Sequence, residues 1–491
     1  MFSNHLKLFT FTGNIKILHM TWIAFFISFV VWFNHAPLML MIAKTLGMSN
    51  PEIKTILLLN VALTIPARII IGILVDKFGP TRSYSFLLSV AAIPCFMFAF
   101  ANSFEQLALA RFLLSFVGAG FVIGIRMVGE WFPAKQVGIA SGIYGGLGNI
   151  GSAVAAGTLP ILSMVYGGDE GWRYAIASTG LIALLYSGIY FFCVSDTPPG
   201  ITYHKPEKNG AMEVTSIGDM FFYIFMSMPL YLALTLLTWK LSPAAGVNLV
   251  SIHFIIDSYI TIALLFVLNV YKIVHINIKN LQQPIDKIHQ YKFKQIALLD
   301  LAYFITFGSE IAVVSILPMF FFDTFHNSQG VTMVQAGLLT GSFAFINLLA
   351  RPAGGWISDK FGRKLSLNIF VLGLSVGYFG ISFINSEWSL VPTVLMTMSC
   401  SFFVSAGCGA VFSFVPLIKR RITGQIAGMV GAYGNVGGVL FLTLLSFISI
   451  ELFFKILAVT ALFILIALQF IDEPKERLSE DQGNSTDVIL N

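Results

Sequence analysis

The sequence has little charge for its length. Only 11% of its 491 residues are Asp, Glu, Lys or Arg, while 56% are hydrophobic; soluble proteins carry roughly 25% charged residues. The apolar residues come in blocks of about 20, the length that crosses a bilayer. A soluble fold is therefore excluded, and the lipid bilayer is the expected surrounding. The net charge of +5 does not indicate nucleic-acid binding, because the basic residues lie in short loops between the apolar blocks.

The sequence also lacks the residue patterns of disulfide frameworks, metal centres and enzymes. Its four cysteines lie inside apolar blocks without metal-ligand spacing and are expected to be small, buried helix residues. No serine-histidine-acid arrangement or phosphate loop is present, so we expect no enzyme, cofactor or metal. We also find no cleavable signal, because the first apolar block, from about Trp22, is too long and lacks a small-residue cleavage site.

The apolar blocks predict about fourteen membrane spans, grouped as six, two and six. They divide the chain into a six-helix bundle in 1–195, a linker with two extra helices in 196–292, a second six-helix bundle in 293–471 and a polar cytoplasmic tail in 472–491. The extra helices, at about 220–240 and 249–272, are expected to lie outside the twelve-span core and to contribute no substrate ligand. Their few polar residues, such as His253 and Asp257, have no counterpart elsewhere in the repeat.

Basic residues gather in alternate loops. Lys77 and Arg82 follow the second span, and Lys360, Arg363 and Lys364 follow the corresponding span of the second half. By contrast, the segment 322–332 contains no Lys or Arg. Because cytoplasmic loops carry the excess of Lys and Arg, both termini are expected on the cytoplasmic side of the cell's inner (cytoplasmic) membrane.

The two six-span halves are related in sequence. GILVDKFG at 72–79 recurs as GWISDKFG at 355–362, which lies 283 residues later. A Gly-Asn-hydrophobic-Gly run at 148–151 recurs at 434–437. Repeated features in the same order indicate a parallel duplication, which is how major facilitator transporters are built. We therefore expect an all-α polytopic membrane protein of the major facilitator fold, with its substrate site between the halves near the bilayer midplane.

Each DKFG motif carries an acid and basic residues at the end of a span. Its glycine permits close helix approach, and Asp76 or Asp359 could pair with helix termini or basic groups in one conformation and release them in another. We expect a gate at these motifs. Arg126 and Glu130, four residues apart at the end of the fourth span, are expected to form an intrahelical pair or to join the gate.

Two arginines lie inside apolar spans rather than at their ends. Arg68 and Arg351 each precede the DKFG aspartate by eight residues, so each is about 12 Å deeper along its helix. At that depth an arginine costs at least about 2.5 kcal/mol on insertion scales and needs a partner or a wet cavity. The repeat would direct both toward the central cavity, where they would repel unless an anion lay between them. The planar guanidinium suits a planar oxyanion; snorkelling or pairing with a buried acid is the alternative.

The fifth span of each six-span half is rich in glycine and contains one asparagine. Small residues at short spacing favour close helix packing and sliding, and packing alone would explain most of these glycines. Asn149 and Asn435 differ, because an amide inside an apolar span needs a hydrogen-bond partner. We expect each to bond either a neighbouring helix or the substrate.

These segments together resemble the nitrate/nitrite porters of the major facilitator superfamily. The resemblance covers both halves but not the extra spans at 220–272, and it is carried by IPARIIIGILVDKFGPTR, GAGFVIGIRMVGEWFP, GIYGGLGNIGSA and LARPAGGWISDKFGR. It implies a secondary active transporter, functional as a monomer, that moves nitrate or nitrite by alternating access. In that family two arginines bind the anion, an asparagine of the fifth span assists and aromatic rings sandwich it. The expected substrate-site residues here are, in chain order, Arg68, Phe121, Asn149, Tyr303, Phe307, Arg351 and Asn435.

Two residues are candidates for coupling transport to protons. Glu310 shares a helical face with Tyr303 and Phe307, and a carboxylate in a cavity of low polarity can carry a proton. Ionised, it would offset one arginine and let the empty carrier return; protonated, it would leave both arginines free for the anion. His35 in the first span is the second candidate. We therefore favour proton-linked symport, while a static ion pair is the alternative role for Glu310.

Other functions stay open at this point. The same two-arginine site would serve a nitrate/nitrite antiporter or a carrier of another small anion such as a carboxylate. Proton-coupled peptide carriers also have two extra spans, but the first span here lacks their cluster of acids. A transporter-like sensor would be expected to carry an added signalling domain, and the polar tail spans only 472–491.

Overall fold

The computed structural model describes residues 10–206, 210–243, 251–282 and 290–474. In this part of the chain every regular element is an α-helix or a 3-10 helix. By length and composition, thirteen segments of it could cross a membrane, and α13 (Met333–Phe361) stands where the remaining span is predicted. The prediction of an all-α polytopic membrane protein is confirmed.

The first half contains six crossings, three of which are broken helices. Its elements are α1 (Gly13–Phe33), η1 (Ala36–Leu38), α2 (Met39–Leu46), α3 (Asn50–Leu59), α4 (Thr64–Phe78), α5 (Pro80–Ala99), α6 (Phe104–Leu114), η2 (Ser115–Ala119), α7 (Gly120–Trp131), α8 (Val137–Tyr166) and α9 (Gly171–Cys193). The broken crossings are α1 with α2, α3 with α4, and α6 with α7.

Side chains form hydrogen bonds with backbone groups at the break in the second crossing. Trp32 Nε1 donates to the backbone carbonyl of Asn60, next to the break, at 2.9 Å, and buried Arg111 donates to the side-chain oxygen of Asn60. The amide of Leu63 donates to Ser115 Oγ at 3.0 Å. Backbone groups inside a membrane must find partners within the protein, so these side chains permit an interruption where the sequence predicted a continuous span.

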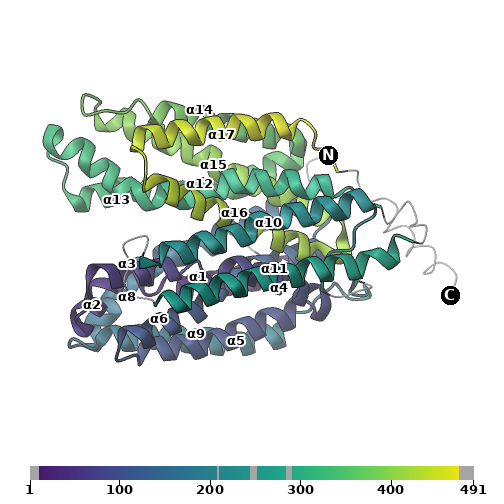
Figure 1. The fold of residues 1–491 in the computed structure, drawn as a ribbon, viewed down its shortest axis with the longest axis horizontal. Coiled ribbons are helices and arrows are strands. Elements are labelled where there is room, and N and C mark those ends of the chain that lie inside the picture. The colour runs from purple at the N-terminus through teal and green to yellow at the C-terminus, as the bar shows by residue number, and fades with distance from the viewer. Residues whose placement is uncertain (1–9, 207–209, 244–250, 283–289, 475–491) are drawn as a thin grey trace.

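The second half repeats the arrangement with six crossings. Its elements are α12 (Phe293–Gln329), α13, α14 (Arg363–Ile381), α15 (Leu390–Ile418), η5 (Arg420–Ile422), α16 (Thr423–Leu445) and α17 (Ile450–Leu468). Figure 1 shows this half, in green and yellow, lying above the purple and blue first half. The halves meet mainly where α4 packs against α16 and α8 packs against α13.

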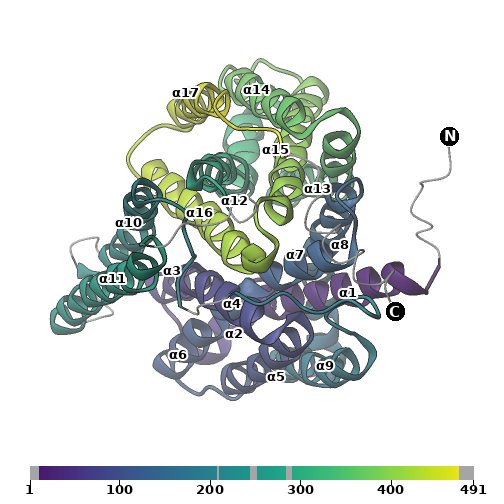
Figure 2. The same ribbon diagram turned by 90° about the vertical axis from the view of Figure 1, so that its right-hand side faces the viewer.

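The two extra helices lie outside this core. Figure 2 shows α10 (Ile217–Lys240) and α11 (Ile252–Asn280) projecting from one side of the two bundles, with α11 outermost. α10 packs against α16, α12 and α4, and α11 packs against α10. His253 and Asp257 are exposed on α11, away from the space between the halves.

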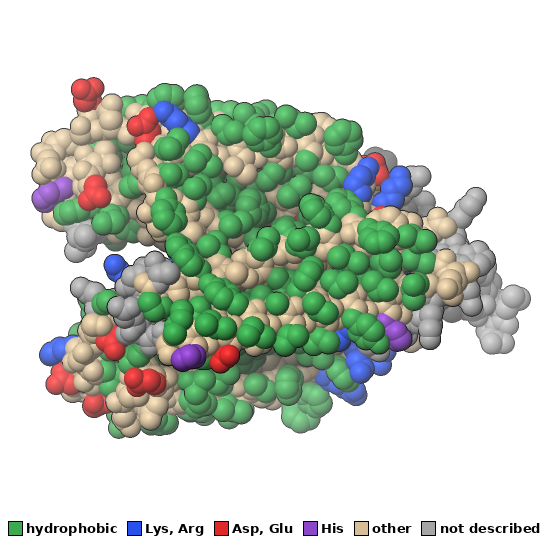
Figure 3. Space-filling model, viewed as in Figure 1, with side chains coloured by type: hydrophobic (Ala, Val, Ile, Leu, Met, Phe, Trp, Pro, Cys, Tyr) green, Lys and Arg blue, Asp and Glu red, His purple; other side chains and the backbone are tan. Residues whose placement is uncertain are grey.

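The two ends of the molecule differ in charge and shape. The first and last described residues lie at one end (Figure 1), which we call the terminal end. Figure 3 shows a flank covered by hydrophobic side chains, with Lys and Arg gathered at the terminal end and most Asp and Glu at the other. At that other end a notch separates the halves (Figure 3), and we call it the notched end.

Candidate anion-binding site and gate

The two intramembrane arginines approach the same aromatic ring from opposite halves. The guanidinium carbons of Arg68 on α4 and Arg351 on α13 lie 5.4 and 5.5 Å from the centre of the Phe307 ring, within cation–π range. Both arginines are buried, at 1% and 2% exposure. The two cations are thus at most about 11 Å apart, where like charges repel by roughly 1.5 kcal/mol at an effective dielectric constant of about 20.

Arg351 is surrounded by acceptors. Its Nη2 donates to Glu310 Oε2 at 3.0 Å and Oε1 at 3.2 Å, and its Nε donates to Asn347 Oδ1 at 2.6 Å. With its amide oxygen turned toward the guanidinium, Asn149 accepts from Nη1 at 3.0 Å and Nη2 at 3.2 Å. That orientation follows because arginine offers donors only. One carboxylate therefore offsets the charge of Arg351, and one amide from the other half contacts it.

Glu310 is held in place from two further directions. Asn347 Nδ2 donates to its Oε1 at 2.5 Å, and Cys408 Sγ lies 3.6 Å from its Oε2. The pair with Arg351 that the sequence left as an alternative is thus present in this conformation. The sequence interpretation missed Asn347, although a polar residue four positions before an intramembrane arginine was a readable signal.

Arg68 has no carboxylate partner in the described part of the chain. Its Nη1 donates to the carbonyl of Gly431 on α16, and Nε has no partner there. A Cβ at Gly431 would lie 3.2 Å from both Cδ and Nη1 of Arg68, so a larger residue would press on the guanidinium. Two arginines and one carboxylate leave the site with one net positive charge, which favours a monovalent anion.

Aromatic rings from both halves line the site. Tyr303 and Phe307 stack with centres 5.0 Å apart and planes at 6°. Phe412 on α15 meets Tyr303 edge-on at 4.8 Å and Phe121 at 4.6 Å, so it links the aromatic groups of the two halves. The sequence interpretation missed Phe412, because one Phe among 47 carries no distinguishing signal.

Two predicted residues are not joined to the arginines. Asn435 is 1% exposed, and neither of its amide atoms has a hydrogen-bond partner in the described structure. His35 is buried against Phe98, with ring centres 6.3 Å apart, and its ring nitrogens also lack partners there. No contact found in the described residues connects His35 to Glu310.

The structure adds a buried acid that the sequence interpretation did not single out. Asp300 on α12 is fully buried, and neither carboxylate oxygen has a partner in the part of the chain that the structure describes. It lies three residues before Tyr303, on the same helical face. The span was predicted to start at about 294, so Asp300 was expected near the membrane surface, where an acid need not be buried.

Each DKFG aspartate caps a helix of the opposite half. Asp76 accepts from the amides of Gly424 and Gln425, both at 2.8 Å, at the start of α16. Asp359 accepts from those of Gly138 at 3.1 Å and Ile139 at 2.8 Å, at the start of α8. The first amides of a helix lack intrahelical partners and carry the positive end of the helix dipole, so each carboxylate fastens the two halves together.

Paired glycines allow this close approach. A Cβ at Gly72 would lie 2.5 Å from the carbonyl oxygen of Gly424, and one at Gly355 would lie 2.0 Å from that of Gly138. Both distances are shorter than real Cβ contacts. The motif glycines thus let α4 touch α16 and α13 touch α8 at the terminal end.

A buried ionic network surrounds Asp76 at the candidate gate. Arg126 Nε lies 3.2 Å from Asp76 Oδ1, and its Nη1 lies 2.9 Å from Glu130 Oε1. Arg420 of the second half contacts Glu130 Oε2 through Nη2 at 2.9 Å. Tyr203, in the segment after α9, accepts from Arg126 at 2.9 Å and donates to the Val75 carbonyl at 2.7 Å. Burial raises the pKa of Tyr203, so its hydroxyl keeps the proton that it donates.

Two six-span bundles arranged in this way are the architecture of major facilitator transporters. The profile of the Major Facilitator Superfamily matches residues 21–280 and 299–489. Among solved structures, the Major Facilitator Superfamily transporter FucP in its outward conformation aligns with a TM-score of 0.65 and 12% identity, covering 94% of this chain and 100% of that one. At that identity the match shows the fold alone.

Curated relatives share much more of the sequence than this solved structure does. The chain is 44% identical to the nitrate/nitrite transporter NrtP of Picosynechococcus sp., over 98% of this chain and 97% of that protein. It is 45% identical to NrtP of Nostoc punctiforme, over 96% and 94%, and 23% identical to the probable nitrate/nitrite antiporter NarK1 of Thermus thermophilus, over 93% and 90%. The chain belongs to the nitrate/nitrite porter family of the Major Facilitator Superfamily, as the sequence motifs predicted. It is a multi-pass membrane transporter and not an enzyme.

Proposed function

We propose that this protein carries nitrate, nitrite or both across the cytoplasmic membrane, as a monomer, by alternating access between its two halves. The observation that supports the proposal is the approach of Arg68 and Arg351 to one ring, at 5.4 and 5.5 Å, with a single carboxylate beside them. A site of one net positive charge with two planar donor groups matches a small planar oxyanion. The nitrate/nitrite transporters among the relatives support this substrate.

In this proposal the conformation described here faces outward. The halves are fastened at the terminal end through Asp76 and Asp359 and parted at the notched end. Because Lys and Arg favour the cytoplasmic side, we assign the terminal end to the cytoplasm. Inward release then requires each aspartate to leave the helix that it caps while the notched end closes.

We favour a proton-linked carrier over an obligate exchanger, because Glu310 contacts Arg351 at 3.0 Å. With the acid ionised and no anion bound, the site carries one positive charge rather than two, so the empty carrier can reorient with less uncompensated charge. Protonation of Glu310 would release Arg351 to the anion. Proton and anion would then move inward together. An exchanger is the second candidate, since NarK1 carries the name of an antiporter.

Uptake by purified protein in proteoliposomes tests the proposal. We expect saturable uptake of nitrate, nitrite or both, driven by an inward proton gradient and strongly reduced in Arg351→Lys. Uptake only in exchange for internal anion, without dependence on the pH gradient, would favour the antiporter. Uptake of acetate or formate in place of nitrate and nitrite would favour a carboxylate carrier and overturn the substrate assignment.

A further inference from the structure

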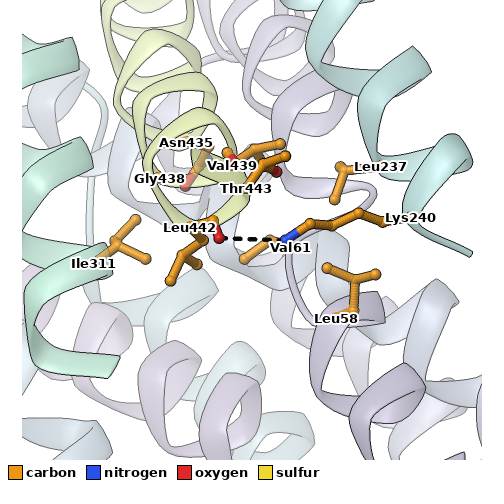
Figure 4. Close-up of a pocket in the computed structure, with 10 residues that line it drawn as sticks. All are labelled: Leu58, Val61, Leu237, Lys240, Ile311, Asn435, Gly438, Val439, Leu442 and Thr443. Atoms are coloured by element: carbon orange, nitrogen blue, oxygen red, sulfur yellow. Dashed lines mark hydrogen bonds between the residues drawn. The ribbon is translucent and has the colours of Figure 1, made fainter. Parts of the chain in front are cut away.

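A small cavity of about 30 Å³ lies between the core and the extra helix α10. Its walls come from α16, from α12, from the second crossing of the first half and from α10, and most of them are apolar. Ten residues line it: Leu58, Val61, Leu237, Lys240, Ile311, Asn435, Gly438, Val439, Leu442 and Thr443. Figure 4 shows the Lys240 side chain extending from α10 across this space toward α16.

Lys240 is the one charged residue among the ten that line the cavity. Its ammonium donates to the Leu442 carbonyl at 3.4 Å (Figure 4), which is long for an N–H···O hydrogen bond. An ammonium has three donors, and no other contact for this one is found in the described structure. A lysine whose task was only to fasten α10 to the end of α16 would be expected to make shorter and more numerous contacts with its carbonyls.

Asn435 supplies the second polar group of the cavity. Its amide is 1% exposed and has no partner for either atom in the described residues. A buried amide without partners is unfavourable by roughly 1–3 kcal/mol. A ligand or water in the cavity would satisfy it. Thr443, the remaining side chain with a polar atom, already donates to the Val439 carbonyl at 2.7 Å.

The cavity and Arg68 adjoin the same face of α16. Gly431, Asn435, Gly438 and Leu442 are spaced by four, three and four residues and therefore share that face. Lys240 contacts the Leu442 carbonyl, and Arg68 contacts the Gly431 carbonyl. These two contacts are about 16 Å apart along the helix, and Asn435 lies between them. Because of this separation, one small ion would contact Lys240 and Asn435 one after the other and not both at once.

We propose that the cavity between Lys240 and Asn435 is an outer binding subsite for the transported anion, through which it reaches Arg68. The inference rests on the proposed function, and its ligand class is a small monovalent oxyanion. Lys240 attracts the anion at the rim, and the amide group of Asn435 receives it before the guanidinium does. The extra helix thereby contributes a side chain to the transport route, contrary to the sequence-based expectation that the extra pair contributes none.

The experiment measures nitrate and nitrite uptake with the full-length protein from both sides of the membrane. Intact cells without their own nitrate uptake present the notched end, and inside-out vesicles present the terminal end. The variants are Lys240→Gln, Lys240→Arg and Asn435→Ala. Lys44→Gln is the matched control, because Lys44 near the end of α2 is an exposed lysine at the notched end that pairs with Asp169 at 3.5 Å.

In Lys240→Gln we expect the KM for external anion to rise about threefold or more and to lose most of its salt dependence. The maximal rate should change by less than about twofold, and the KM measured in inside-out vesicles should stay the same. Lys240→Arg should restore the external KM, Asn435→Ala should raise it, and Lys44→Gln should leave it unchanged.

Three results would overturn the subsite. One is an unchanged external KM in Lys240→Gln while the parent protein transports normally. Another is a fall in maximal rate and melting temperature without a change in KM, which would make Lys240 a structural contact. The third is an equal rise of KM on both sides. If the parent protein transports neither nitrate nor nitrite, the proposed function fails and the subsite fails with it. If the parent transports but Lys240→Gln gives one of these three results, the subsite fails alone.

Discussion

Replacing Glu310 with Gln should tighten anion binding and at the same time abolish proton-driven uptake. The carboxylate and a bound anion compete for Arg351, since Glu310 holds Nη2 at 3.0 Å and Nη2 also contacts the amide oxygen of Asn149. Gln is similar in size and retains an acceptor for Asn347. The substitution therefore removes charge while changing shape little.

The magnitude follows from the geometry. An anion that shares the Arg351 guanidinium with Glu310 would lie about 7 Å from the carboxylate, where two negative charges repel by roughly 2 kcal/mol at an effective dielectric constant of about 20. Relief of that repulsion corresponds to about a thirtyfold lower Kd. Without the carboxylate the empty carrier holds an uncompensated buried cation, a penalty of about 3–5 kcal/mol, so its return should become rate-limiting.

The assay compares three quantities for parent and Glu310→Gln: the nitrate Kd by calorimetry, uptake driven by an inward proton gradient, and exchange of labelled for unlabelled anion. We expect a lower Kd, no gradient-driven uptake and preserved exchange. Glu451→Gln is the matched control, because Glu451 pairs with Lys455 at 2.6 Å on the exposed side of α17. It should behave as the parent does.

Two outcomes would refute this reasoning. If Glu310→Gln retains gradient-driven uptake, the acid is a static partner of Arg351 and the proton is carried elsewhere. If the Kd is unchanged or weaker, the carboxylate does not compete with the anion. A parent protein without any dependence on the pH gradient would favour the antiporter and leave Glu310 a structural role.

Four further substitutions follow from the same contacts. Arg68→Lys or Arg351→Lys keeps the charge but loses the planar fork of donors. Because a charged hydrogen bond is lost, we expect nitrate binding to weaken about tenfold to a hundredfold, while membrane insertion stays normal. Near-normal transport by either variant would contradict the site. Asn149→Ala should weaken binding about fivefold with an unchanged melting temperature, whereas parental affinity would make Asn149 a packing residue. Asp76→Asn weakens the cap on α16 and should destabilise the conformation closed at the terminal end by about 1 kcal/mol. A cysteine introduced at that end should then be labelled faster, and unchanged labelling would exclude a gating role.

Much of this protein could be predicted from its sequence, because the bilayer imposes simple rules on the chain. Because charged side chains are unfavourable in lipid, each span is a block of about 20 mostly apolar residues, and the spans can be counted along the sequence. The repeat of GILVDKFG 283 residues later identified the fold, since a duplicated six-span unit has few architectures available. Arg68 and Arg351 could be singled out for the same reason, because an intramembrane arginine needs a functional or structural partner.

Only the tertiary structure decided which residues meet. Glu310 and Arg351 are on different helices, as are Phe412 and Phe121, and helical periodicity gives the face of each residue but not the helix that it faces. The breaks at η1, η2 and before α4 depend on partners such as Arg111, which no local signal connects to Asn60. Lys240 reads as an ordinary residue at the end of a span, and only the packing of α10 against α16 directs its ammonium into the cavity beside Asn435. Composition and repeat determined the architecture, whereas the site depends on distances between helices, which packing sets.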